Sequence, residues 1–302
     1  MTDPKADIEK GNAALTSVAA AVLLTGLKIG VGVMSGSLGI LAEAAHSGLD
    51  LLAAIVTLVA VRVSSIPADQ NHAYGHGKAE NLSALVETLL LLATCVWIIS
   101  EALERLTAHG VVVDASIWTF LVMGISIVVD VTRSRMLYRA ARKHHSQALE
   151  ADALHFSTDI WSSAVVIVGL TGVKLAGWFP HLDYMKRADA VAALVVAVIV
   201  IAVSLQLGRR TIQALLDAAP AGAAARIQEA VQSLDQVMDC HAVRVRQSGP
   251  QYFVDLHILL EGGMSLNAAH ELTERVEQTV QALLPGADVT VHPEPQPSAN
   301  LD

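Results

Sequence analysis

The chain has 302 residues, of which 53% are hydrophobic and 16% are charged, and its formal net charge is -9. Soluble globular domains carry roughly 25% charged residues, so this composition excludes an ordinary soluble protein and indicates segments that span a lipid bilayer. The acidic balance argues against a nucleic-acid partner, which would require a basic face.

Six apolar segments follow one another along the first two thirds of the chain. Each approaches the length of about 20 residues that a helix needs to cross a bilayer. The N-terminal residues are too polar and acidic for a signal peptide, so we expect the first segment to remain as a span. The predicted membrane helices cover residues 13–34, 38–62, 81–104, 115–137, 151–176 and 187–207.

Basic residues in the connections predict the orientation. Arg135, Arg139 and Arg142 lie between the fourth and fifth spans, whereas the turn between the first and second spans has no Lys or Arg. Connections rich in Lys and Arg stay in the cytoplasm. Both termini are therefore expected in the cytoplasm, as an even number of spans requires.

The last third of the chain predicts a small soluble domain. Residues 223–237 and 265–284 have helical spacing, and the strand-like segments HAVRVRQ and YFVDLHILL are joined by the turn Ser248-Gly249-Pro250, before a last strand DVTVH. We predict a polytopic α-helical membrane protein: a six-helix transmembrane domain over residues 1–207, then a cytoplasmic α+β domain of αββαβ, ferredoxin-like type over 208–294. The remaining residues, 295–302, are predicted to be a disordered tail.

A short internal repeat carries the main functional signal. Residues 42–50 read AEAAHSGLD and residues 151–159 read ADALHFSTD. Residues four apart share one face of a helix, so His46 projects with Asp50 and His155 projects with Asp159. If the two helices face each other, two imidazoles and two carboxylates converge inside the membrane.

Four nitrogen and oxygen ligands suit tetrahedral Zn²⁺, and two carboxylates cancel its charge in a medium where an uncompensated ion is costly. Histidine binds metal only when it is neutral, so protons compete with the metal for such a site. A single pair of this kind could equally be a hydrogen bond between packed helices. Two copies of one nine-residue pattern favour metal binding.

With these motifs, the sequence resembles the cation diffusion facilitator (CDF) family, and most closely its bacterial FieF/YiiP-like members. The resemblance covers nearly the whole chain and implies a homodimeric zinc/proton antiporter, not an enzyme, in the bacterial inner membrane. In that family the matching positions His46, Asp50, His155 and Asp159 hold the transported ion. Some FieF-like members have Asp at the position of His46 and a broader selectivity that includes Cd²⁺ and Fe²⁺, so the histidine favours Zn²⁺.

The resemblance also implies cytoplasmic zinc sites and a pair that links the domains. In the loop PADQNHAYGHGKAEN, an Asp and two His lie close together beside glycines, an arrangement that could hold a metal. Lys78 matches a family lysine that pairs with an aspartate after the sixth span, here Asp217. The implied ligands are Asp69, His72 and His76 in this loop, and His241, His257, His270, His292 and Glu294 in the soluble domain.

Several alternatives stay open at this point. Asp130 and Arg133 could form a simple ion pair, and Glu87 could line a proton path or lie at an interface. Cys240 could be a further ligand or a packing residue. Two other functions fit a metal-binding membrane protein: an intramembrane metalloenzyme, which lacks the support of an HExxH motif here, and a membrane-anchored metal sensor.

Overall fold

The computed structural model describes residues 4–36, 38–107, 117–178 and 185–296. Eight helices and three strands are found in these residues. In chain order they are α1 (Pro4–Ser35), α2 (Leu38–Ser64), α3 (Lys78–Thr107), α4 (Ile117–His144), α5 (Gln147–Trp178), α6 (Met185–Leu215), α7 (Ala223–Gln232), β1 (Asp239–Ser248), β2 (Gln251–Leu260), α8 (Leu266–Leu283) and β3 (Asp288–Pro295).

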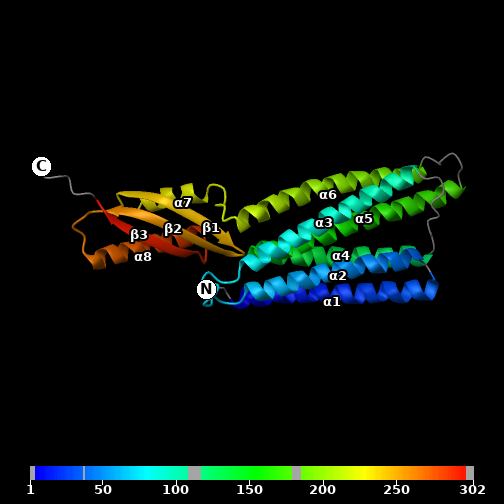
Figure 1. The fold of residues 1–302 in the computed structure, drawn as a ribbon, viewed down its shortest axis with the longest axis horizontal. Coiled ribbons are helices and arrows are strands. Elements are labelled where there is room, and N and C mark those ends of the chain that lie inside the picture. The colour runs from blue at the N-terminus through cyan, green and yellow to red at the C-terminus, as the bar shows by residue number, and fades with distance from the viewer. Residues whose placement is uncertain (1–3, 37, 108–116, 179–184, 297–302) are drawn as a thin grey trace.

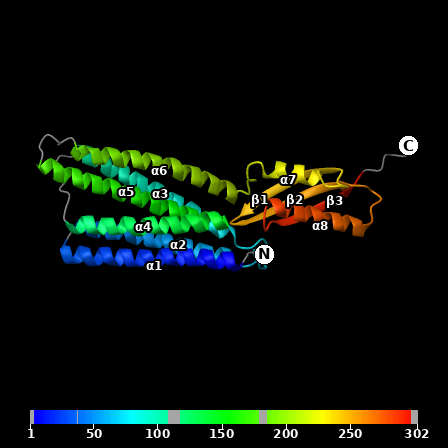
Figure 2. The same ribbon diagram turned by 180° about the vertical axis from the view of Figure 1, so that it is seen from behind.

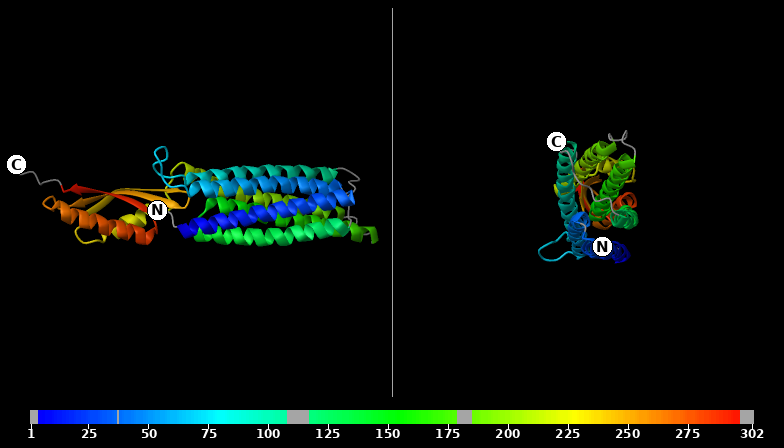
Figure 3. Two further views of the ribbon diagram at one scale, coloured as in Figure 1. Left: turned by 90° about the horizontal axis from the view of Figure 1, so that it is seen from below. Right: turned by 90° about the vertical axis from the view of Figure 1, so that its right-hand side faces the viewer.

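The first six helices form an elongated bundle, and the α+β domain lies beyond one end of it (Figures 1 and 2). The predicted fold class is confirmed. α1 packs against α2, α3 against α6, and α4 against α5. By length and apolar composition, five helices of the described chain can each cross a membrane: Pro4–Ser35, Glu43–Ser64, Lys78–Glu104, Ile117–His144 and Leu194–Leu215. The remaining helix, α5, covers the fifth predicted span and runs alongside the others (Figures 1 and 3).

The surface of the bundle fits a lipid environment. Large apolar side chains are exposed on it, and such side chains can pack against lipid acyl chains. Examples that are each more than half exposed are Leu23, Met34, Val128 and Val198. Between the helices the packing uses small residues, among them Ala14, which is fully buried. Small side chains at the interfaces let membrane helices approach closely. The larger apolar side chains lie on the outer surface of the bundle.

The helices extend further than the predicted spans at the end nearest the α+β domain. α1 begins at Pro4, α4 ends at His144, and α6 continues to Leu215, past the predicted domain boundary at residue 207. Hydropathy identifies the apolar part of a helix, whereas backbone hydrogen bonding continues into its polar end. α1, with 32 residues, is about 48 Å long, well over the roughly 30 Å of a bilayer core.

A buried polar cluster joins four helices at this same end. Glu80, at the start of α3, is fully buried and accepts a hydrogen bond of 2.9 Å from the ammonium group of Lys10 on α1. The hydroxyl of Ser64 at the end of α2 donates to Glu80 over 2.7 Å, and Ser146, just before α5, also donates to it. The charges of Glu80 and Lys10 are thus paired, as burial requires.

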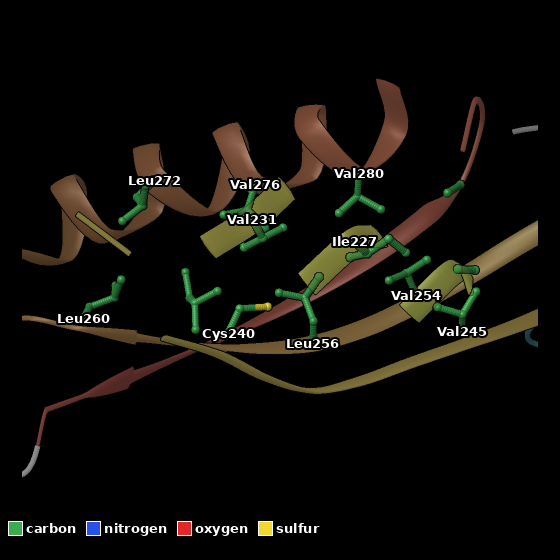
Figure 4. Packing of buried hydrophobic residues seen from close by; sticks show 13 residues of the cluster. Ile227, Val231, Cys240, Val245, Val254, Leu256, Leu260, Leu272, Val276 and Val280 are labelled. Carbon is green, nitrogen blue, oxygen red and sulfur yellow. The ribbon is translucent and has the colours of Figure 1, made fainter. Parts of the chain in front are cut away.

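In the α+β domain, α7 and α8 cover one face of a three-stranded sheet of order β1-β2-β3. β1 and β2 are antiparallel, and β2 and β3 are parallel. Figure 4 shows the core between the layers, where Leu272, Val276 and Val280 project from successive turns of α8 toward the sheet, which contributes Leu256 and Leu260 of β2. Ser265 caps the start of α8, since its hydroxyl oxygen accepts a hydrogen bond from the Ala268 amide.

A β-bulge in β1 was not predicted. The register shifts between His241 and Arg244, and Ala242 has a φ of 50°. Cys240 and Val245 are an odd number of residues apart, yet both are buried against the helices. In a regular strand they would point to opposite faces. The extra residue of the bulge leaves His241 on the open face and returns Val245 to the core.

The chain end differs slightly from the predicted boundaries. β3 includes Pro295, the first residue of the predicted tail, and the amide of Gln296 donates a hydrogen bond to the carbonyl of Leu260. The strand therefore continues one residue into that segment, and one further backbone hydrogen bond holds Gln296. The rest of the predicted tail, residues 297–302, lies outside the described residues.

Candidate metal centres

Two helices carry the four residues His46, Asp50, His155 and Asp159, which we call the intramembrane cluster. The first two stand one turn apart on α2 and the last two stand one turn apart on α5, so each pair shares a face. The Nε2 atom of His155 lies 3.0 Å from Oδ1 of Asp50, and Nε2 of His46 lies 3.8 Å from Oδ1 of Asp159. The two halves of the sequence repeat therefore meet.

The spacing of these atoms suits one metal ion. Nε2 of His46 lies 3.9 Å from Oδ1 of Asp50, and Nε2 of His155 lies 3.7 Å from Oδ2 of Asp159. Zn²⁺ holds such ligands at about 2.0–2.2 Å, which in a tetrahedron separates the ligand atoms by roughly 3.4 Å. His46, Asp50 and Asp159 have ligand atoms within 4.8 Å of one another, and His155 contacts both carboxylates.

Most side chains of the intramembrane cluster are buried, and a buried polar group without a partner lowers the stability of the fold. Asp50, His155 and Asp159 are each less than a tenth exposed. The Nδ1 atoms of His46 and His155 are buried and have no hydrogen-bond partner among the residues that the structure describes. Two carboxylates in an apolar bundle need positive charge nearby, and a divalent cation at this point would supply it.

A lysine next to the cluster was missed by the sequence analysis. Lys28 of α1 is 5% exposed, and its ammonium group donates to Ser47 over 2.7 Å and lies 3.3 Å from a carboxylate oxygen of Glu43. It lies beside the turn of α2 that carries His46. A lysine in the middle of an apolar segment is itself a sequence signal, because such residues are rarely placed in a membrane without a function.

Further charged residues lie buried between the helices. The guanidinium group of Arg133 lies 3.5 Å from Asp130 on the same helix, so the predicted pair is present. It also donates to the hydroxyl of Ser17 over 3.1 Å, and that hydroxyl donates to Asp152 of α5 over 3.2 Å. Glu87 of α3 is fully buried and accepts a hydrogen bond from Thr57.

The loop between α2 and α3 brings its three predicted ligands together, and we call them the loop cluster. Nδ1 of His72 lies 3.3 Å from Asp69, and Nε2 of His76 lies 3.5 Å from Asp69. The backbone N–H groups of His72 and Asn71 donate to the Asp69 carboxylate, and mainly the first of these lowers the pKa of Asp69. The carboxylate therefore stays ionised and available to a cation.

The open face of the sheet carries a second group, His241, His257, His292 and Glu294, which we call the sheet cluster. The three histidines are in register on adjacent strands. Glu294 lies 2.8 Å from Nδ1 of His257, 3.3 Å from Nε2 of His241 and 3.8 Å from Nε2 of His292. The hydrogen bond from His257 is the main cause that lowers the pKa of Glu294. Asp239, missed by the sequence analysis, contacts Nδ1 of His241 at 3.0 Å.

Two other candidates lie apart from the sheet cluster. His270 is on α8, which covers the opposite face of the sheet, and its Nε2 atom faces Glu274 at 3.6 Å. Within one chain it does not join the other histidines. Cys240 is fully buried in the apolar core, and burial raises the pKa of its thiol to about 11. A thiol that resists deprotonation is a poor metal ligand, so packing is its role.

The loop cluster adjoins the contact between the bundle and the α+β domain. The ammonium group of Lys78 lies 3.0 Å from Asp217, and Arg246 of β1 lies 3.8 Å from the same carboxylate. Arg246 also stacks over the ring of Tyr74 at 4.0 Å. The tip of the β1–β2 hairpin reaches α3, where the amide of Gly249 donates to Asn81 over 2.9 Å.

Comparison with known proteins gives consistent matches along the chain. Residues 14–216 match the family model of the cation efflux transmembrane domain, and residues 220–296 match that of the cation efflux protein cytoplasmic domain. The cation-efflux pump FieF of Serratia proteamaculans is 33% identical over 290 residues, which cover 94% of this chain and 92% of the relative. FieF of Escherichia coli O1:K1 is 31% identical over 284 residues, with the same coverage.

Proposed function

Because this chain belongs to the cation efflux family, we propose that the ion it exports is Zn²⁺ and that protons move inward in exchange. The chain is a multi-pass membrane transporter of divalent cations. The choice of zinc, with Cd²⁺ and Fe²⁺ as further substrates, and the coupling to protons form the proposal. The intramembrane cluster is the proposed transport site.

The ligand set supports zinc. Two imidazoles and two carboxylates can close around one ion without a fifth ligand, the arrangement that Zn²⁺ prefers. Oxygen-preferring ions such as Mg²⁺ and Mn²⁺ gain less from nitrogen donors. Since four ligands leave no open position for a substrate, the cluster suits binding and release of an ion better than catalysis on a bound water.

The same ligands support proton exchange. Zn²⁺ and H⁺ compete for the ring nitrogens of His46 and His155, because a protonated imidazole has no lone pair for a metal. Where protons are abundant, the metal leaves more readily. A proton gradient directed into the cell therefore favours binding from the cytoplasm and release on the other side.

We place the protein in the bacterial inner membrane with both termini in the cytoplasm. The basic residues in the last turns of α4, Arg139, Arg142 and Lys143, support this orientation, and the start of α1 lies at this same end of the bundle, nearest the α+β domain (Figure 1). The match to the cytoplasmic dimerisation domain supports a homodimer. The loop and sheet clusters are proposed to hold structural zinc, since each offers at least three converging donors.

The observation that carries the proposal is the approach of His155 to Asp50 inside the bundle. The test is a flux assay in proteoliposomes that contain a zinc-sensitive dye, run with and without a pH gradient. We expect zinc flux that rises with the gradient, that is lost in Asp50→Ala and Asp159→Ala, and that persists in the control Asp235→Asn, an exposed carboxylate outside the bundle.

Two outcomes would replace this proposal with another function. Zinc binding without flux would indicate a membrane-anchored sensor, and hydrolytic activity that disappears in His46→Ala would indicate a metalloenzyme. Equal flux with and without the gradient would remove proton coupling while leaving zinc transport in place. Parallel assays with Cd²⁺, Fe²⁺ and Mn²⁺ establish the selectivity.

A further inference from the structure

Two carboxylates lie buried near the intramembrane cluster but outside it. Glu87 of α3 and Asp152 of α5 are both fully inaccessible to solvent. Each has one oxygen that accepts a hydrogen bond from a hydroxyl, Thr57 for Glu87 and Ser17 for Asp152. The other oxygens, Oε2 of Glu87 and Oδ1 of Asp152, are buried and have no partner in the described part of the chain.

Their position follows from the helices that carry them. Asp152 is three residues before His155 and so lies on the same side of α5, one turn closer to the end nearest the α+β domain. Thr57, which holds Glu87, is seven residues after Asp50 and so lies two turns closer to that same end on α2. The charge of Glu87 interacts with those of both Asp152 and His155.

The charges around these two groups do not balance. α4 contributes Arg133, which must serve Asp130 as well as Asp152. α1 and α2 present the hydroxyls of Ser17 and Thr57, and the cluster adds His155 of α5 and the carboxylate of Asp50 on α2. α6 has no ionisable residue between positions 194 and 208. Among the described residues, no lysine or arginine therefore neutralises Glu87.

An ionised carboxylate in such surroundings is unfavourable in free energy, and binding of a proton removes its charge. No donor among the described residues reaches Glu87 Oε2 or Asp152 Oδ1, as expected of a carboxyl oxygen that itself carries the proton. A divalent ion entering the intramembrane cluster would change this balance, because its positive charge stabilises nearby carboxylates. Occupancy by metal and occupancy by proton are then linked.

We propose that Glu87 and Asp152 form a proton-binding site, separate from the metal ligands, whose proton is exchanged for the transported ion. This rests on the proposed function of antiport. When the ion binds from the cytoplasm, the O–H bond of the carboxyl group breaks and its proton passes to water on that side. When the ion leaves on the opposite side, the carboxylate takes a proton from water there. No other group is consumed.

The experiment counts protons and zinc ions together. Proteoliposomes with a pH dye and a zinc dye give the number of protons exchanged per zinc ion for the wild type, Glu87→Gln, Asp152→Asn and the double variant. We expect the ratio to fall by about one in Glu87→Gln or in the double variant, with zinc binding retained. The control is Glu150→Gln, two residues from Asp152 on α5, whose carboxylate forms an ion pair with Arg210 at the surface.

A conservative variant separates a proton-binding role from a structural one. Glu87→Asp keeps an acid that can bind a proton and is expected to keep the wild-type ratio, whereas a merely structural role predicts similar damage from both substitutions. If the wild type exchanges protons and all three neutral variants show the same ratio, the inference is wrong and antiport stands. If the wild type moves zinc without protons, the proposed coupling fails and the inference fails with it.

Discussion

The Nε2 atom of His155 lies 3.0 Å from Oδ1 of Asp50, although the two residues are 105 positions apart in the chain. One belongs to α5 and the other to α2, so the contact exists only when the two halves of the bundle are packed together. A metal ion bound here would link these halves. Removal of one ligand tests that link directly.

Asp50→Asn keeps the shape of the side chain and removes its negative charge. The substitution leaves an ion in the cluster with a single carboxylate, and the uncompensated charge is costly in the bundle interior. We expect zinc affinity at this site to fall by at least about 100-fold, more than the loss of a residue that only supports a ligand. Calorimetry with the loop and sheet clusters disabled measures it, and unchanged affinity would contradict the assignment.

His46→Asp tests the basis of selectivity. The change replaces a nitrogen donor by an oxygen donor at a residue of the intramembrane cluster. Oxygen ligands favour ions lower in the Irving–Williams series, so the ratio of Mn²⁺ flux to Zn²⁺ flux should rise. Flux of both ions in the same proteoliposome preparation gives the ratio. A ratio equal to that of the wild type would show that selectivity is determined elsewhere.

Gly77→Ala tests the contact between the domains. A Cβ atom at Gly77 would lie 2.4 Å from the carbonyl oxygen of Ser248, so the backbone of the hairpin would have to move. We expect a loss of about 1–3 kcal/mol in stability, seen as a lower unfolding midpoint in detergent. Gly11→Ala is the control, because its Cβ would meet no atom within 4 Å. Equal midpoints for the two variants would contradict this close packing.

His257→Ala and His270→Ala separate the members of the sheet cluster from a distant histidine. His257 contacts Glu294 at 2.8 Å, so its loss should reduce the zinc bound per chain. His270 faces Glu274 instead, and its loss should leave that zinc content unchanged within a single chain. Elemental analysis of the purified protein measures both. Loss of zinc in His270→Ala would show that this histidine binds the metal from a second copy of the chain.

Cys240 gives a prediction for pH. Its pKa is raised to about 11 by burial, above the value of about 8.5 for an unfolded thiol. The fold thus favours the protonated form, and this contribution to stability is present below the unfolded pKa and lost as pH rises through the folded one. In a Cys95→Ser background, maleimide at pH 8 should label Cys240 only after denaturation. Rapid labelling of the native protein would contradict its burial.

The sequence predicts most of the fold because its signals are local. Apolar runs mark the bundle, and the turn Ser248-Gly249-Pro250 marks the hairpin between β1 and β2. The repeated spacing of His and Asp also marks the intramembrane cluster, since a helix fixes which residues share a face. A local pattern is enough in each case.

Features that depend on packing could not be predicted in the same way. The bulge at Ala242 arises because both Cys240 and Val245 must reach the core, a requirement that appears only when the helices cover the sheet. The hydrogen bonds of Asp152 to Ser17 and of Thr57 to Glu87 join residues far apart in the chain. Nothing in the spacing of these residues indicates which helices will be neighbours.

The backbones of Gly77 and Gly249 lie so close that neither position has room for a methyl group. One turn further along α3, Oδ1 of Asn81 accepts a hydrogen bond from the Gly249 amide. The Nδ2 group of Asn81 donates a hydrogen bond to the side chain of Gln147 at the start of α5. Because the two backbones are in direct contact, a small rotation of the β1–β2 hairpin would also move the start of α3. A tilt of the sheet would thus shift the first turns of α3 and α5, and α5 carries two of the four proposed metal ligands of the intramembrane cluster.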